Sequence, residues 1–110
     1  MQKADYSQLD QRYEGLVNIF AYLVKERVYG PVDRMARATD LDTVRLAVYE
    51  ALRYASTELK RGVKIYVPSE GEVQDFLRAV EKRIGLAREI AIKALTRGLQ
   101  MEVSSSGGEK

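Results

Sequence analysis

The stretch SEGEVQDFLRAVEKRIGLAREIAIKAL, residues 69–95, carries the clearest structural signal in the sequence. It opens with a capping-box pattern, in which the Ser69 hydroxyl and the Glu72 carboxylate each satisfy a backbone N–H at a helix start. The apolar residues that follow recur at steps of three and four, the spacing that places side chains on one helical face. The stretch therefore predicts one long amphipathic helix that begins at Ser69 and is interrupted only by Gly85.

Upstream of this stretch, the same periodicity predicts two further long helices and a short one. The first long helix is expected over Asp5 to Val28, and Pro31 suits the first turn of a short helix over Pro31 to Ala38. The second long helix follows Asp40 or Asp42, either of which can cap it, because a short carboxylate accepts bonds from first-turn N–H groups. It is expected to end at Gly62, since glycine accepts the left-handed conformation that often terminates helices.

The remaining segments lack helical periodicity. Residues 63–67 alternate apolar and polar side chains, which predicts an extended connector near 63–68. Residues 104–110 have no apolar side chain to bury, so a flexible tail is expected over 102–110. The predicted fold is all-α, a small helical bundle of three long helices plus one short helix, in a single domain over residues 1–101.

The predicted core lies where the apolar stripes of the three long helices meet, because each stripe has to contact another to leave water. Tyr13 is expected to be buried with the first stripe, and Gly15 in the same helix indicates a close contact with a neighbouring segment. The core is drawn from Leu16, Phe20, Leu23, Val48, Leu52, Leu59, Phe76, Leu77, Val80, Ile84 and Leu95.

Composition excludes several classes of function. The chain has 110 residues, enough for one core, and contains no Cys and no His. Disulfides, thiolate nucleophiles, common zinc sites and imidazole acid–base chemistry are therefore excluded. No apolar run reaches the length of about 18–20 residues that a membrane span needs, so we expect a soluble, cytoplasmic protein. A single Asn and abundant Glu, Lys and Arg resemble the residue usage of thermophiles.

No pattern of catalytic residues is present. The carboxylate pairs Glu70 with Glu72 and Asp40 with Asp42 could bind a metal ion or act as acid and base, but both lie at predicted helix starts, where capping accounts for them. The sequence holds no glycine-rich phosphate loop, and its serines lack a His partner. We therefore expect no enzyme activity, no metal, no cofactor and no small-molecule substrate.

Positive charge is concentrated locally, although 18 Lys and Arg nearly balance 16 Asp and Glu. Three cations lie between residues 60 and 64 without an acid, and three more share one sector of the long helix predicted from Ser69. Glu89 falls in the same sector, so the alternative of a solvated helix face stays open. The predicted nucleic-acid contacts, which bind phosphates without reading sequence, are Lys60, Arg61, Lys64, Arg78, Lys82 and Lys93.

Three segments in order resemble a known family. They are YGPVDR at 29–34, VYEALR at 48–53 and KIYVPSE at 64–70. Over residues 15–98 the chain resembles the small subunit of archaeal type I-A CRISPR interference complexes. The resemblance implies a non-catalytic subunit whose copies stack along the complex and contact its other subunits. Its nucleic-acid partner is either crRNA or single-stranded DNA, the target or displaced strand of the R-loop that the subunit supports. It assigns no individual cation to nucleic acid.

Two other functions remain as alternatives. One is a helical oligomerisation or scaffold module without a nucleic-acid role, whose tyrosines and extended connector form a subunit interface. The other is a small transcription regulator in which Pro31–Ala38 and the following helix form a helix-turn-helix. The regulator is disfavoured because Asp40 and Asp42 at the start of its recognition helix would repel phosphate.

Overall fold

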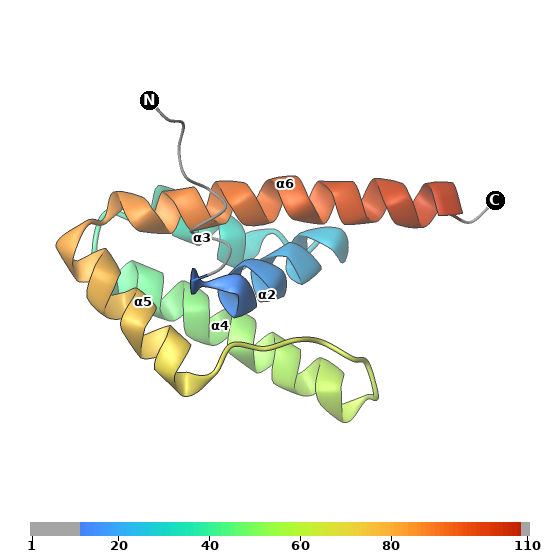
Figure 1. Cartoon of the computed structure of the whole chain (residues 1–110), viewed down its shortest axis with the longest axis horizontal. Helices are drawn as coiled ribbons and strands as arrows, with labels where there is room; N and C mark the ends of the chain where they lie inside the picture. Colours follow the sequence, from blue (N-terminus) through green and yellow to red (C-terminus); the bar gives the residue numbers. More distant parts are fainter. Residues whose placement is uncertain (1–11, 109–110) are drawn as a thin grey trace.

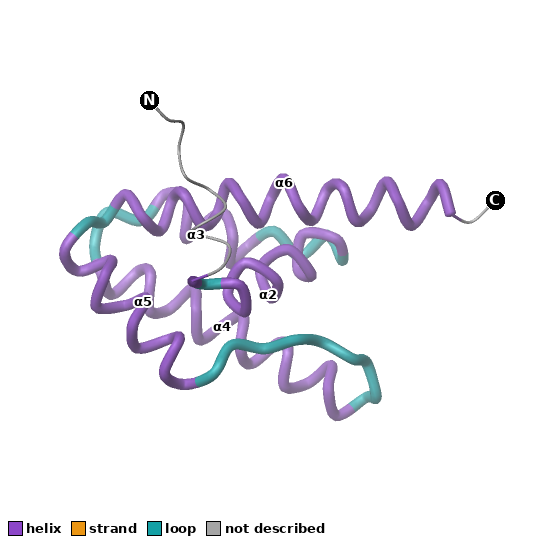
Figure 2. The backbone as a smooth tube through the Cα atoms, viewed as in Figure 1, coloured by secondary structure: helices purple, strands orange, loops and turns teal. Residues whose placement is uncertain are grey.

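The computed structural model describes the backbone of residues 12–108 and the side chains of residues 12–101. All of the regular structure in this part of the chain is helical, which confirms the all-α class (Figures 1 and 2). Within it, no helix combines the length and apolar character that a membrane crossing requires. The helices are α2 (Glu14–Lys25), α3 (Gly30–Arg37), α4 (Leu41–Lys60), α5 (Glu70–Lys82) and α6 (Gly85–Gly108).

Helix α2 lies at the centre of the core and is buried along most of its length. Its predicted start at Asp5 lies outside the described residues. It ends at Lys25, three residues before the predicted end at Val28. Phe20 from α2 and Phe76 from α5 are fully buried, as predicted. Tyr13, the residue before α2, packs edge-on against Phe76 with ring centroids 5.3 Å apart. Aromatic burial therefore joins α2 to α5.

The long helix predicted from Ser69 is wrong in one respect, because the chain turns a corner between α5 and α6 (Figure 1). Arg83 adopts an extended backbone, and Ile84 forms the turn. A straight helix over residues 69–95 would be about 40 Å long, whereas the 12-residue α2 is about 18 Å long. Bending at Arg83 lets both halves close on the same core, so residues 12–108 contain four helices besides α3 where three were predicted.

Three predicted core residues are instead exposed. Leu59 is 43 % exposed because the last buried residue of α4 is Glu58, one position earlier. The corner after α5 rotates the buried face of α6 onto Leu86 and Ile90, which leaves Ile84 and Leu95 at 37 % and 38 % exposure. Leu52 packs partly buried against the core. The remaining predicted core residues are buried: Leu16, Phe20, Leu23, Val48, Phe76, Leu77 and Val80.

Two glycines mark close approaches of the chain. A Cβ atom on Gly15 would lie 2.6 Å from the Cα of Pro68, so the contact expected of Gly15 is made with the connector. A Cβ atom on Gly98 would lie 2.5 Å from the Cβ of Val24 and 2.6 Å from the carbonyl oxygen of Ala21. Helices α2 and α6 therefore approach each other to a distance that only glycine permits at this crossing.

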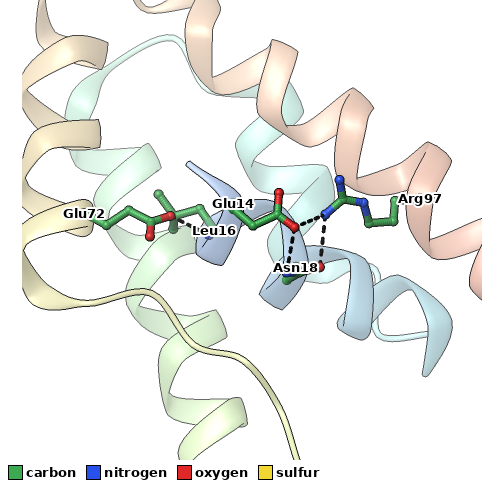
Figure 3. Close-up of polar contacts among 5 residues, drawn as sticks. All are labelled: Glu14, Leu16, Asn18, Glu72 and Arg97. Atoms are coloured by element: carbon green, nitrogen blue, oxygen red, sulfur yellow. Dashed lines mark hydrogen bonds and ion pairs between the residues drawn. The ribbon is translucent and has the colours of Figure 1, made fainter. Parts of the chain in front are cut away.

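Polar contacts join α2 to α6 on one side and to α5 on the other (Figure 3). The Arg97 guanidinium on α6 donates to the Glu14 carboxylate at 3.2 Å and to the Asn18 side-chain oxygen at 3.0 Å, both on α2. On the other side of α2, the Glu72 carboxylate accepts a hydrogen bond from the Leu16 backbone N–H at 2.9 Å. Helix α2 is thus tied to α6 and to α5. Beyond Met101, α6 continues as a helix to Gly108 over the segment predicted as a tail, and residues 109–110 lie outside the described residues.

Candidate nucleic-acid interface

A basic surface lies where α4 ends and the connector to α5 begins. Helix α4 stops at Lys60, and Gly62 turns the chain with a φ of 90°, in the left-handed region that glycine tolerates. After this turn the connector runs extended, as predicted, and its side chains alternate. Ile65 and Val67 pack against the core, whereas Lys64 and Tyr66 face solvent. Three of the predicted contacts, Lys60, Arg61 and Lys64, are therefore exposed in one region.

A fourth cation, Arg53, extends this surface, although we did not include it in the predicted contacts. Arg53 is exposed on α4 and lies seven residues before Lys60, a spacing of two helical turns on nearly one face. That i, i+7 relationship was the sequence signal that could have identified it. We call this surface the basic tip and define it as Arg53, Lys60, Arg61 and Lys64.

The segment that carries the basic tip is poor in acidic residues. Glu58 is the only acidic residue between positions 53 and 69, and it is 9 % exposed. The Arg61 guanidinium contacts its carboxylate at 3.2 Å, and the Tyr22 hydroxyl donates to it at 3.3 Å. Burial, followed by the charges of Glu26 and Glu58, raises the pKa of Tyr22 to about 12. Arg61 is thereby anchored while its side chain stays 69 % exposed.

Lys60 and Lys64 are free to meet an anion. Within residues 12–101, no carboxylate lies within ion-pair distance of either amine. Tyr66, beside Lys64 on the outer side of the connector, is 59 % exposed. An exposed aromatic ring among cations provides a platform on which an unpaired base can stack.

The other three predicted contacts do not join the basic tip. Arg78 on α5 pairs with Asp75 at 3.0 Å, and Lys82 is exposed at the end of α5. Lys93 lies on α6, beyond the corner at Arg83, so the single helical sector predicted for these residues is wrong. Figure 1 shows that the corner between α5 and α6 and the end of α4 lie at opposite ends of the molecule. The six predicted residues therefore form no single surface.

The carboxylates of the pair Asp40 and Asp42 each have a partner three residues later. The Asp40 carboxylate caps α4 by accepting from the Thr43 backbone N–H at 2.8 Å, which lowers the pKa of Asp40. Asp42 pairs with Arg45 at 2.8 Å. Within the described part of the chain, no group of three or more acidic side chains is arranged to hold a metal ion.

One open groove of about 600 Å³ lies at the other end of the molecule, between the end of α3 and the start of α6. Its wall combines apolar side chains such as Ile84 and Ile92 with Arg37 and Arg88. Arg37 is paired with Asp33 at 2.9 Å. The groove is separate from the basic tip.

Comparison of the chain with protein-family models, with curated proteins and with solved structures gives no match.

Proposed function

We propose that this chain is a non-catalytic helical subunit that binds nucleic-acid backbones weakly and without sequence preference. Following the family resemblance, we place it in a crRNA-guided antiviral interference complex, where it supports the R-loop. The observation that carries the proposal is the basic tip, whose four exposed cations surround a segment with one buried acid.

The chemistry of the basic tip suits a single strand. Lysine and arginine neutralise phosphates and release condensed counterions, so the affinity falls as salt rises. Tyr66 adds stacking, which tolerates any base. About four phosphate contacts from one copy give weak binding, so useful affinity requires several copies or docking onto a larger complex.

The test compares single-stranded DNA binding by the wild type and by a variant carrying Lys60→Glu and Lys64→Glu. Arg61 is retained because its removal would leave the buried Glu58 without its cation. Fluorescence anisotropy of a labelled oligothymidine reports binding. With four contacts, wild-type affinity should fall about 50-fold between about 50 mM and 200 mM salt. The variant should bind more weakly and lose only about sevenfold over the same range.

A matched control makes the same change of charge with Arg45→Glu, near the start of α4, and Lys82→Glu, the last residue of α5. Figure 1 shows both of these helix ends away from the end of α4 that carries the basic tip. This control should bind like the wild type at both salt concentrations, and circular dichroism should show that both variants keep their helices. Equal losses in the two variants, or wild-type binding that does not respond to salt, would overturn the basic tip as the interface.

Assignment to an interference complex is tested separately by the genes that flank the coding sequence. We expect them to include a crRNA-processing nuclease and a helicase. A neighbourhood with neither would reject the complex assignment and leave backbone binding to be judged on the anisotropy data.

A second candidate is an oligomerisation module without a nucleic-acid role. Three exposed apolar side chains on α6, those of Ile92, Leu95 and Leu99, favour it. This candidate takes the place of the first if the wild type does not bind single strands.

A further inference from the structure

Glu58 occupies a position where the pattern of α4 favours an apolar side chain. Ala51, Ala55 and Glu58 follow one another at steps of four and three, on the face of α4 that packs against the core. Burying a carboxylate costs free energy, and a negative charge near the C-terminal end of a helix opposes the helix dipole. The contacts of Glu58 must therefore offset two costs.

Hydrogen bonds from two parts of the chain converge on Glu58. Its two carboxylate oxygens accept from different donors, the Tyr22 hydroxyl on α2 at 3.3 Å and the Arg61 guanidinium at 3.2 Å. Its backbone carbonyl oxygen accepts from the N–H groups of Arg61 and Val63, at 3.0 Å and 3.1 Å. Glu58 thus fixes the end of α4, the turn at Gly62 and the side chain of Arg61 relative to α2.

Arg61 is held on one side and open on the other. A guanidinium group has five N–H donors in a rigid plane. The printed contact with Glu58 involves the Nη1 atom, and the side chain remains 69 % exposed. The donors that face solvent match the geometry of phosphate oxygens. The ammonium groups of Lys60 and Lys64, in contrast, are compact charges on flexible stems, without a fixed direction.

We propose that Glu58 is a positioning residue of the basic tip, which holds the Arg61 guanidinium so that its open side binds a backbone phosphate. This inference rests on the proposed function, because it assigns roles within the same surface. A side chain that is already ordered loses less conformational entropy when its ligand binds. Arg61 therefore provides a directed phosphate contact, while Lys60 and Lys64 provide charge.

Charge alone would give Glu58 the opposite effect on binding. Its carboxylate repels phosphates, so its removal should strengthen binding. At about 150 mM salt, screening over about 8 Å limits this gain to less than about twofold. Ordering a free arginine on binding lowers the affinity about 2–10-fold. The effect of positioning is thus the larger one, and the direction of the change in affinity distinguishes the two accounts.

Glu58→Gln and Glu58→Met form a matched pair, because both remove the same charge. The glutamine oxygen can accept from Arg61 while its amide group donates to the Tyr22 hydroxyl oxygen. Methionine has a similar length but offers Arg61 no strong acceptor. With labelled oligothymidine at about 150 mM salt, Glu58→Gln should bind as tightly as the wild type or up to about twofold more tightly. Glu58→Met should bind about threefold more weakly than the wild type.

Thermal denaturation of Glu58→Met separates positioning from a structural role. An apolar side chain of similar size replaces a buried carboxylate, and the arginine left behind is exposed, so the midpoint should stay unchanged or rise. The half-buried Tyr22 hydroxyl can donate to water instead. Weaker binding without a loss of stability supports positioning. A fall in the midpoint together with weaker binding would assign Glu58 to stability and reject the proposal.

Arg61→Lys tests the same contact with Glu58 in place. Lysine keeps the charge but lacks the planar donors, so binding should weaken about fivefold, the effect of one lost hydrogen bond. In the Glu58→Met background the same change should have little further effect, because the two residues act together. The matched control is Arg45→Lys, at an arginine that also pairs with a carboxylate three residues earlier, that of Asp42. This control should bind like the wild type.

Three results would reject the positioning role: equal binding by Glu58→Gln and Glu58→Met, tighter binding by Glu58→Met than by the wild type, or an equal loss from Arg61→Lys in both backgrounds. If the wild type still binds with the expected salt dependence, these results leave the proposed function in place. A wild type that does not bind single strands would reject both proposals, so the two failures are distinguishable.

Discussion

The Glu72 carboxylate on α5 accepts a hydrogen bond at 2.9 Å from the backbone N–H of Leu16, 56 residues earlier in the chain. Leu16 lies in the first turn of α2, where helical N–H groups have no intrahelical acceptor. Tyr13, at the N-cap of α2, provides no side-chain cap. A residue from another helix therefore caps α2, and this contact fixes the start of α2 against α5.

Removing this cap should destabilise the fold. Glu72→Ala leaves the Leu16 N–H without its partner in a partly buried position, and we expect a loss of about 1–2 kcal/mol in the free energy of unfolding. Burial raises the pKa of Glu72, so the charged form carries a desolvation cost that a neutral amide avoids. Glu72→Gln keeps an acceptor oxygen and should stay within about 0.5 kcal/mol of the wild type. Urea denaturation of both variants measures the difference, and equal losses would contradict the capping role.

The N-cap of α5 provides a second test. The Ser69 hydroxyl accepts from the Glu72 backbone N–H at 3.1 Å, so Ser69→Ala should cost about 1 kcal/mol. Ser69→Asp retains a capping acceptor and should restore most of the loss. The midpoint of urea denaturation reports both changes, and an unchanged midpoint in Ser69→Ala would show that the cap contributes nothing to stability.

The crossing of α2 and α6 should not tolerate a side chain at Gly98. An added methyl group would meet the Val24 side chain and the Ala21 carbonyl oxygen, so Gly98→Ala should destabilise the protein by about 2–3 kcal/mol. Gly71 on α5 is the matched control, because its nearest neighbour would lie at 3.8 Å, an ordinary contact distance. Gly71→Ala should be neutral or stabilising by up to about 1 kcal/mol. Thermal denaturation distinguishes the two, and a loss in Gly71→Ala equal to that in Gly98→Ala would argue against a close crossing.

Tyr22 should make stability sensitive to alkaline pH. Its pKa is raised from 10.0 to about 12 by burial first and then by Glu26 and Glu58. The unfolded chain therefore loses the phenolic proton at lower pH than the folded chain. Stability is fully present below pH 10.0 and declines as the pH rises towards about 12. Thermal midpoints across this range should fall more steeply for the wild type than for Tyr22→Phe, and parallel curves would refute the shifted pKa.

The sequence by itself determined the local structure. Ser69 caps α5 as predicted, Asp40 is the one of the two predicted candidates, Asp40 and Asp42, that caps α4, and Gly62 terminates α4. Residues 63–67 form the predicted extended connector, in which Lys64 and Tyr66 face solvent. These features depend on contacts within a few residues, where backbone geometry and side-chain chemistry act without reference to the rest of the chain.

Only the tertiary structure decided what depends on distant segments. The apolar periodicity of residues 69–95 continues through the corner at Arg83, so the pattern does not reveal the bend. An apolar stripe does not show whether its helix is longer than the core that it covers. The capping box assigned the Glu72 side chain to its own helix, whereas packing of α5 beside α2 places it on Leu16. The cations of the basic tip lie together because they are close in sequence along α4 and the connector. Lys93, in contrast, is separated from Arg78 by a bend that local spacing does not reveal.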